Sequence, residues 1–279
     1  MGIIAEKIKN KVPKNVRKDF KEKFIGLMLR RFKPKILFEL DINDKYQIKT
    51  ARTHKELIEV LRLRYEVFLG VLEQHFDQGI DFDKYDLLGD HILLIEKSTD
   101  KIIGTYRLMC SLFTDSFYSE NEFTIEEFLK VPGIKLELGR ACIHPDYRNG
   151  VTINLVWKGL GKYVSLVEAD YLFGCSSVNT VSYRASQNFL QSLGPDKISD
   201  QWDIKPKAPY LFQLSMSDMA GTANPTEVVD MPPLLGSYFK AGAKVYSPPA
   251  LDRDFSCIDL LTILNMRDLD PKYRKRYLG

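Results

Sequence analysis

Residues 136–169, LELGRACIHPDYRNGVTINLVWKGLGKYVSLVEA, contain the pattern of a strand, a loop and a helix. Residues 134–143 alternate between apolar and polar side chains, which predicts a β-strand. The loop at 144–150 is rich in Pro, Asp, Asn and Gly, which favour turns. From Val151 onward the apolar side chains recur at helical spacing. The N-terminus of such a helix attracts anions, because its first amides are unpaired and the helix dipole is positive there.

The composition is that of a core-forming globular protein. Of the 279 residues, 44% are hydrophobic and 28% are charged, enough for one large domain or two small ones. The four cysteines are widely spaced and form no CxxC pair, which argues against a disulfide framework or a zinc site. We expect no metal, and we interpret all four cysteines as small buried apolar residues.

The charge is distributed unevenly along the chain. Residues 1–35 hold twelve basic and three acidic residues, a net charge of +9, whereas the remainder has a net charge of −6. We therefore divide the chain into a basic, amphipathic arm at 1–45 and a single domain at 46–279. Three interpretations of the arm stay open: a helix lying on an anionic membrane surface, a packed helix with a solvated basic face, and a segment that docks an acidic carrier protein. Its apolar face comprises Val16, Phe20, Phe24, Leu27 and Met28.

The arm lacks the features of a signal peptide, and no stretch approaches the roughly 20 apolar residues of a membrane span. We expect a cytoplasmic protein, with the inner face of the membrane as an open alternative. No nucleic-acid partner is expected.

Strands and helices alternate along the rest of the chain, and several strands follow one another directly, which predicts one mixed α/β domain. The further predicted strands are 46–52, 91–96, 102–111, 171–178, 210–215, 243–247 and 256–264, and the further helices are 55–70, 123–129, 182–193 and 232–241.

Several charged residues lie in runs that otherwise have the pattern of buried segments. Such charges are costly to bury unless they are paired. They could form a structural network among themselves, or they could hold a charged substrate in a cleft. An aspartate-rich loop at 77–90 has the same ambiguity, since most of its acids could be solvated or cap helices. The charged residues in apolar runs are Arg64, Arg107, Glu137 and Arg140.

These motifs together resemble a known family. LRYEVF (63–68), Asp83-x-x-Asp86, GTYRL (104–108) and Glu137-x-x-Arg140 resemble, in order and spacing, the signature of acyl-homoserine lactone synthases in the Gcn5-related N-acyltransferase (GNAT) superfamily. The segments FYSENEF (117–123), LELGRACIHPDYR (136–148) and the tail at 232–261 are closer to the N-acyltransferases of the ornithine-lipid type. The resemblance covers residues 50–275.

The resemblance implies a twisted mixed sheet with splayed central strands and helices on both faces. It also implies transfer of a fatty acyl or 3-hydroxyacyl group from a phosphopantetheine thioester to the amine of an amino acid such as ornithine or glycine. The amine attacks directly, without an acyl-enzyme and without a permanently bound cofactor.

The resemblance also assigns roles to individual residues. Glu137 would act as the base or position a water, while Arg107 and Arg140 would orient the acceptor carboxylate or order the cleft. Backbone amides near Arg140 to Cys142 would meet the oxyanion. Asp83 and Asp86 would pair with Arg64 to shape the acceptor end. The full set expected to bind substrate is Arg64, Phe68, Asp83, Asp86 and Cys142.

The loop before the long helix departs from ordinary acetyltransferases, which carry a glycine-rich pyrophosphate loop of the form R/Q-x-x-G-x-G/A. Bulky residues at Val151 and Ile153 would keep backbone amides from wrapping a diphosphate. We therefore expect an acyl carrier protein as donor and partner, with one phosphate held at the helix start. The residues expected there are Arg148, Asn149, Gly150, Val151 and Thr152.

Two other functions stay open at this point. The first is lactone synthesis from S-adenosylmethionine on the same scaffold, which the amino-acid-branch motifs disfavour. The second is a non-catalytic protein that binds a membrane or a carrier protein. The presence of Glu137, Arg140 and Arg107 argues against this second function.

Overall fold

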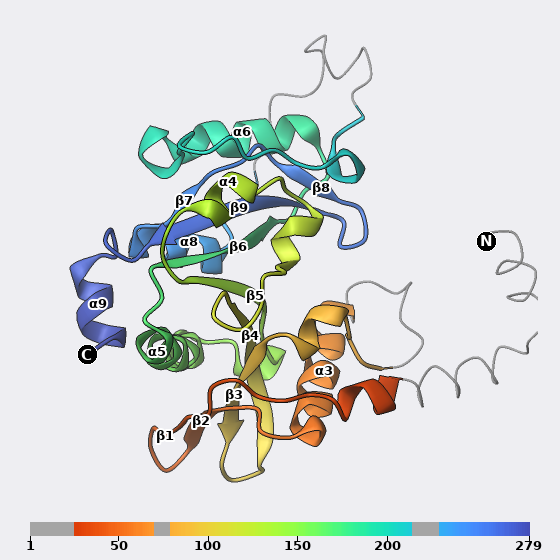
Figure 1. Ribbon diagram of the computed structural model, residues 1–279, viewed down its shortest axis with the longest axis vertical. Helices are drawn as coiled ribbons and strands as arrows, with labels where there is room; N and C mark the ends of the chain where they lie inside the picture. The colour runs from red at the N-terminus through yellow and green to blue at the C-terminus, as the bar shows by residue number, and fades with distance from the viewer. Residues whose placement is uncertain (1–24, 70–78, 214–228) are drawn as a thin grey trace, which may run out of the picture.

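The computed structural model describes residues 25–69, 79–213 and 229–279 (Figure 1). The strands of this part form one nine-stranded sheet in the order β1-β2-β3-β4-β5-β6-β9-β7, and β8 also pairs with β9. Only β5 and β6 run parallel, and all other pairs are antiparallel. The strands are β1 (Glu39–Asp41), β2 (Tyr46–Thr50), β3 (Asp90–Glu96), β4 (Lys101–Cys110), β5 (Lys135–Ile143), β6 (Tyr171–Val178), β7 (Lys244–Val245), β8 (Ala250–Asp252) and β9 (Cys257–Asn265).

Helices cover both faces of the sheet, as the family resemblance predicts. In Figure 1, α3 and α5 lie on opposite sides of β3 and β4. Alternate β3 residues pack toward each of them, with Leu93 in the core under α3 and Leu94 in the core under α5. The helices are α3 (His54–Leu69), α4 (Glu126–Lys130), α5 (Gly150–Val167), α6 (Tyr183–Leu193), α8 (Pro233–Ala241) and α9 (Pro271–Tyr277).

The long helix α5 begins where the sequence predicts it. Asn149 caps it, because its side-chain oxygen accepts from the amides of Val151 and Thr152 at 2.9 and 3.0 Å. Small residues on α5 allow close packing on both sides. A Cβ at Gly159 would lie 2.7 Å from Ile48, and one at Gly161 would lie 2.1 Å from the Tyr277 carbonyl oxygen of α9. The helix is therefore held between the sheet and the C-terminal helix.

The two central strands part soon after they meet. β5 and β6 pair only from Lys135–Glu137 to Tyr171–Phe173, although both strands continue well beyond these residues. On its other side β5 carries a bulge, since Thr105 pairs with Cys142 and Arg107 pairs with Gly139. One of the two β5 residues between these pairs is Arg140, which adopts a left-handed conformation with φ of 52°. The sheet therefore opens at its centre, next to a strained residue.

The described part of the basic arm packs against the domain. Leu29 and Phe32 are buried in the core under α3, whereas Leu27 is exposed. Asp90 accepts hydrogen bonds from the Lys35 and Ile36 amides at 2.7 and 2.9 Å. The boundary at residue 45 falls between the paired strands β1 and β2. The apolar residues Val16, Phe20 and Phe24, on which the membrane hypothesis depends, lie outside the described residues.

Some elements differ from the sequence prediction. Residues 210–213 do not form the predicted strand, because a short 3-10 turn at Ala208–Tyr210 precedes irregular chain there. β1, β8 and α9 were not predicted, since each is too short to show a clear period. In the described ranges, no helix is both long and apolar enough to cross a membrane.

Replacing Gly161 with Ala should destabilise the protein, although Gly to Ala inside a helix ordinarily stabilises by about 1 kcal/mol. The added methyl group would meet backbone atoms of Tyr277, which cannot rotate away. Overpacking of this kind costs roughly 1–3 kcal/mol in the free energy of unfolding, measurable by urea denaturation. Gly150→Ala is the matched control, because a Cβ there meets nothing within 4 Å. A Gly161→Ala protein as stable as the control would contradict the packing of α9 on α5.

Candidate active site

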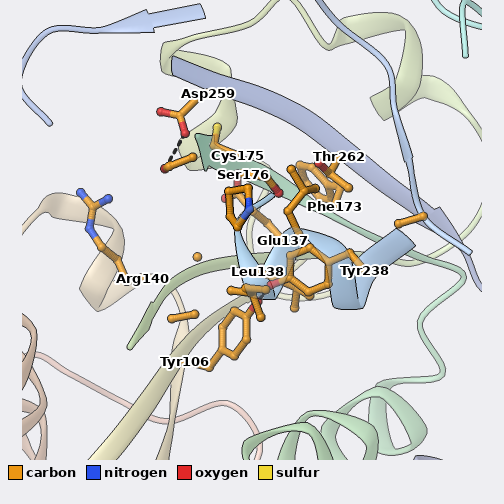
Figure 2. A pocket seen from close by; sticks show the side chains of 18 of the residues that line it. Tyr106, Glu137, Leu138, Arg140, Phe173, Cys175, Ser176, Tyr238, Asp259 and Thr262 are labelled. Carbon is orange, nitrogen blue, oxygen red and sulfur yellow. Dashed lines mark hydrogen bonds between the residues drawn. The ribbon is translucent and has the colours of Figure 1, made fainter. Parts of the chain in front are cut away.

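A cleft of about 630 Å³ opens where β5 and β6 part (Figure 2). It reaches both faces of the sheet, because Leu138 belongs to the core under α5 whereas the adjacent Glu137 points the opposite way. One end is therefore apolar and the other is charged. The apolar end is lined by Tyr106, Leu138, Trp157, Leu160, Leu172, Leu235, Tyr238 and Leu264, and the charged end by Arg107, Glu137, Arg140, Asp252 and Asp259.

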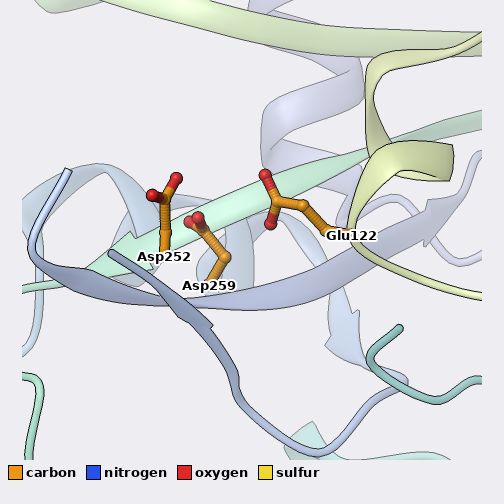
Figure 3. Close-up of side chains that lie close together, drawn as sticks. All are labelled: Glu122, Asp252 and Asp259. Carbon is orange, nitrogen blue, oxygen red and sulfur yellow. The ribbon is translucent and has the colours of Figure 1, made fainter. Parts of the chain in front are cut away.

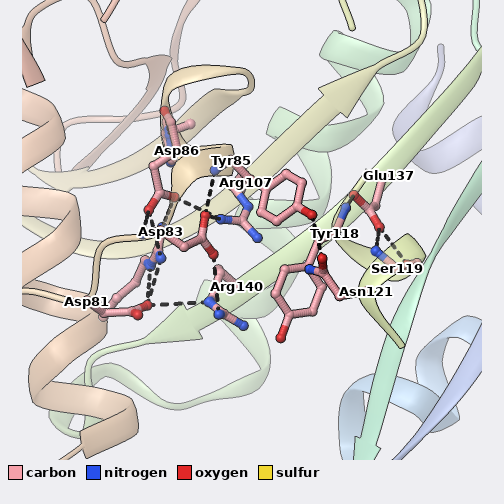
Figure 4. A network of polar contacts seen from close by, with 12 residues as sticks. Asp81, Asp83, Tyr85, Asp86, Arg107, Tyr118, Ser119, Asn121, Glu137 and Arg140 are labelled. Atoms are coloured by element: carbon pink, nitrogen blue, oxygen red, sulfur yellow. Dashed lines mark hydrogen bonds and ion pairs between the residues drawn. The ribbon is translucent and has the colours of Figure 1, made fainter. Parts of the chain in front are cut away.

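Beside the charged end, three arginines and three aspartates alternate in a closed ring of ion pairs. Figure 4 labels five of its members, Asp81, Asp83, Asp86, Arg107 and Arg140. The shortest contacts are Arg64 to Asp86 at 2.6 Å and Arg107 to Asp83 at 2.7 Å. The charges balance within the ring, which offsets part of the cost of burying them. In order around the ring, the pairs are Arg64–Asp86, Asp86–Arg107, Arg107–Asp83, Asp83–Arg140, Arg140–Asp81 and Asp81–Arg64.

The ring corrects one expected pairing. Asp86 does pair with Arg64, but Asp83 pairs with Arg107 and Arg140 instead. The aspartate that joins Asp86 on Arg64 is Asp81, at 2.7 Å. Burial would raise the pKa of Asp86, but the guanidiniums of Arg64 and Arg107 outweigh it and hold that pKa well below its usual range. Asp86 is therefore ionised and shared between two buried arginines.

Arg140 is the arginine of the ring that turns most toward the cleft. Its side chain is 16% exposed, against 0% for Arg64 and 2% for Arg107. Its two aspartate contacts are long, at 3.4 Å each, and its guanidinium lies 4.8 Å from the centre of the Tyr118 ring. Arg140 therefore still has N–H donors that can bind an anionic group, whereas the donors of Arg64 are occupied by its aspartate partners.

Glu137 lies in the cleft outside the ring. Its carboxylate accepts hydrogen bonds from the Tyr118 and Ser119 amides at 2.7 and 2.6 Å and from the Ser119 hydroxyl at 2.5 Å. Burial raises the pKa of Glu137 above its usual value, against the opposing effect of these donors. A carboxylate has roughly four lone-pair positions, so three donors leave one that can accept a proton from a ligand.

The other residues expected to bind substrate lie in three different environments. Phe68 lines the cleft, in edge contact with Phe255. Arg64 is fully buried in the ring, and it supports the cleft without facing it. Cys142 does not reach the cleft, because its side chain packs in the core under α3. The structure therefore gives the Cys142 side chain no place in the cleft, and the expected role of its backbone amide stays a prediction.

Cys175 does line the cleft, on the splayed part of β6. Burial raises the pKa of its thiol well above the usual range, so the thiol is protonated at neutral pH. A thiol in that state is a poor nucleophile. The environment of Cys175 thus agrees with direct attack by an amine.

The loop expected to hold phosphopantetheine lies apart from the described lining of the cleft. Asn149 already occupies the amides of Val151 and Thr152, and Arg148 donates to the Ile143 carbonyl at 3.1 Å. Val151 is exposed, so this helix start faces solvent. A phosphate here would have to share amides with the capping asparagine.

Sequence reasoning missed a second group of acids. Glu122, Asp252 and Asp259 are all buried, and carboxylate oxygens from the three lie within 4.8 Å of one another. Such a group can hold a cation. A usable signal was present, because Asp259 is the single charged residue in the apolar run CIDLLTIL (257–264). Its partners come from distant parts of the chain, which no local pattern reveals.

Comparisons with known proteins agree with this fold class. Residues 63–158, which span α3 to the first turns of α5, match the family described as "Acetyltransferase (GNAT) domain". This part of the chain is therefore similar to a GNAT domain, and the resemblance and the enzyme class predicted from the sequence are confirmed.

More specific relatives are also found. The chain is 29% identical to an L-ornithine N(alpha)-acyltransferase of Rhodobacter capsulatus, over 83% of this chain and 94% of the relative. It is 28% identical to one of Agrobacterium fabrum, over 84% and 85%. Among solved structures it is similar to a CoA-dependent acyl-homoserine lactone synthase, with a TM-score of 0.47, 14% identity and coverage of 79% of both chains.

Replacing Asp86 with Asn should cost about 3–5 kcal/mol in the free energy of unfolding, because it leaves two buried arginines short of a counter-charge. Asp83→Asn is the matched comparison, and it should cost clearly less because the Asp83 side chain is 23% exposed to solvent. Chemical denaturation of both variants measures the difference. Equal losses would show that the ring is no more stabilising at its buried side than at its open side.

Proposed function

We propose that this protein transfers a fatty acyl group from a phosphopantetheine thioester to the α-amine of an amino acid, giving an N-acyl amino acid. The observation that carries the proposal is the placement of two charged residues at the point where β5 and β6 part. Glu137 is the last β5 residue that pairs with β6 and Arg140 lies just beyond it, and both line a cleft whose other end is apolar. The curated relatives named above are ornithine acyltransferases, which supports an amino acid as the acceptor.

The two ends of the cleft suit the two substrates. The acyl chain would occupy the end formed by Tyr106, Trp157 and Tyr238, since aromatic and aliphatic walls favour a hydrocarbon chain. The acceptor would enter the charged end, where its carboxylate meets Arg140. Arg107 then orders the site through its ion pairs with Asp83 and Asp86, because its own side chain is only 2% exposed.

The reaction follows from this arrangement. The neutral amine attacks the thioester carbonyl, and a C–N bond forms as the carbonyl becomes an oxyanion. Glu137 accepts the proton that the amine loses, directly or through one water. Backbone amides from Arg140 to Cys142, where the bulge breaks regular pairing, would stabilise the oxyanion. Collapse of the intermediate breaks the C–S bond, and the thiolate takes up the proton and leaves as the phosphopantetheine thiol, still attached to its carrier.

Glu137→Gln should lower kcat by about 100-fold or more, the usual loss when a general base is removed. Because Glu137 also holds the Tyr118 and Ser119 amides, Ser119→Ala is the matched control. That variant removes the hydroxyl donor and leaves the carboxylate in place. Ser119→Ala should keep kcat within a few-fold. If it loses as much activity as Glu137→Gln at equal thermal stability, Glu137 serves the local structure and is not the base.

The donor in this proposal is an acyl carrier protein. Coenzyme A presents a diphosphate and a ribose phosphate, whereas a carrier-linked phosphopantetheine presents one phosphodiester. The side chain of Asn149 already accepts hydrogen bonds from two amides at the start of α5, so few amides remain there to bind a diphosphate. Carrier proteins are acidic, and Arg148, Lys158 and Lys162 are exposed on or beside this helix.

Steady-state kinetics should therefore favour the carrier-linked substrate over the coenzyme A ester of the same acyl chain. The preference should shrink as ionic strength rises, because salt screens the attraction between the exposed basic residues and the carrier. Equal or better use of the coenzyme A ester, with no salt effect on the carrier reaction, would overturn the choice of donor and leave the acyl transfer itself in place.

A further inference from the structure

The acids Glu122, Asp252 and Asp259, which we call the acidic triad, form a second charged group in the cleft region (Figure 3). Asp252 and Asp259 line the cleft itself. They come from β8 and β9, and Glu122 directly follows the 3-10 turn Tyr118–Asn121 that Glu137 holds. In Figure 3 the three side chains point toward one another. The triad is therefore assembled from the same elements that build the charged end of the site.

The triad differs from the ring of arginines and aspartates in its charge balance. Every aspartate of the ring contacts two arginines, whereas no member of the triad has an ion pair in the described part of the chain. Burial and the neighbouring aspartates raise the pKa of Glu122 well above its usual range, which reflects the missing counter-charge.

Glu122 is the member of the triad whose carboxylate is least satisfied by hydrogen bonds. Its side chain is 0% exposed, yet neither carboxylate oxygen has a hydrogen-bond partner. Leaving a buried polar group unpaired costs about 1–3 kcal/mol, so such groups are rare without a reason. By contrast, Asp252 accepts from the Asp254 and Phe255 amides, and Asp259 accepts from the Ser177 hydroxyl. A cationic donor would satisfy Glu122 and balance all three acids.

We infer that the acidic triad is a specificity site that binds the cationic side-chain ammonium of the acceptor amino acid. This inference rests on the proposed function, and it adds a second binding point beside the one at Arg140. An ammonium group has three N–H donors, which matches three carboxylates. Three acceptors about 2.8 Å from a tetrahedral nitrogen lie roughly 4.6 Å apart. That spacing fits the 4.8 Å limit within which the triad oxygens lie.

A divalent cation is the alternative occupant. Oxygen ligands of Mg²⁺ lie about 2.1 Å from the metal, so adjacent ones are only about 3 Å apart. Both spacings fall within the 4.8 Å limit. The position of Asp252 and Asp259 on the cleft wall favours the ammonium, and metal analysis of the purified protein tests the alternative.

The decisive experiment compares two acceptors, ornithine and norvaline, which share a three-carbon side chain and differ in the terminal amine. Wild-type protein should use ornithine with kcat/KM about tenfold or more above norvaline. Glu122→Gln and Asp259→Asn should remove this preference by raising the KM for ornithine, while norvaline kinetics stay within a few-fold. Asp254→Asn, an exposed acid in the adjoining turn, is the matched control and should behave as wild type.

Each other outcome has a definite meaning. Equal use of both acceptors by the wild type would overturn the specificity site and leave acyl transfer intact. Equal loss of both acceptors in the Gln and Asn variants would make the triad a structural element. A stoichiometric divalent metal that is lost in Asp259→Asn would assign the triad to that metal. If no amino acid is acylated, the proposed function is wrong. Calorimetric measurement of ornithine and norvaline binding to the same variants still decides whether the triad binds the ammonium.

Discussion

The charged half of the cleft depends on the alternating ring of three arginines and three aspartates. Its members come from α3, from the segment at 81–86, from β4 and from β5. Each charge would be expensive to bury alone, so the four segments are tied to one arrangement by the need for counter-charges. The same contacts hold Arg140 against Asp81 and Asp83 at the bulge, where its backbone is left-handed. The ring thus sets the direction in which the neighbouring residues of β5 face the cleft.

Two groups of three acids lie near the cleft. They differ in whether nearby arginines neutralise their charges. The first is neutralised within the protein, and its aspartates contribute to stability and position. In the described residues the second group forms no ion pair with an arginine, and neither carboxylate oxygen of Glu122 has a hydrogen-bond partner. Protein interiors rarely keep such a group without a compensating ligand. A site that leaves one charge unmatched can select for a substrate that supplies it, because a neutral analogue leaves the acids unpaired.

Much of this fold was predictable from local patterns, and part of the site was as well. Arg64, Arg107, Glu137 and Arg140 stand out because charges inside apolar runs require partners. Their partners were predictable only in part. Asp86 pairs with Arg64 as expected, but Asp81 and Asp83 are equivalent in sequence and their pairing depends on the path of the loop. Cys142 was misplaced for a related reason. The bulge in β5 adds a residue directly after Gly139 and inverts the alternation beyond it, so a strictly alternating strand places Cys142 on the wrong face.

The parting of β5 and β6 gives the proposed reaction its geometry. Side chains of neighbouring residues on a strand face opposite sides of a sheet, so Leu138 and Glu137 ordinarily would serve separate environments. Where the strands separate, a substrate can pass between these environments without displacing core residues. An acyl chain bound on the α5 side would place its thioester at the gap. An amine bound on the opposite side of the sheet, beside Glu137, would then reach the thioester. The open centre of the sheet therefore lets one small domain bind a hydrocarbon and an ionised amino acid while keeping the two apart everywhere except at the reacting atoms.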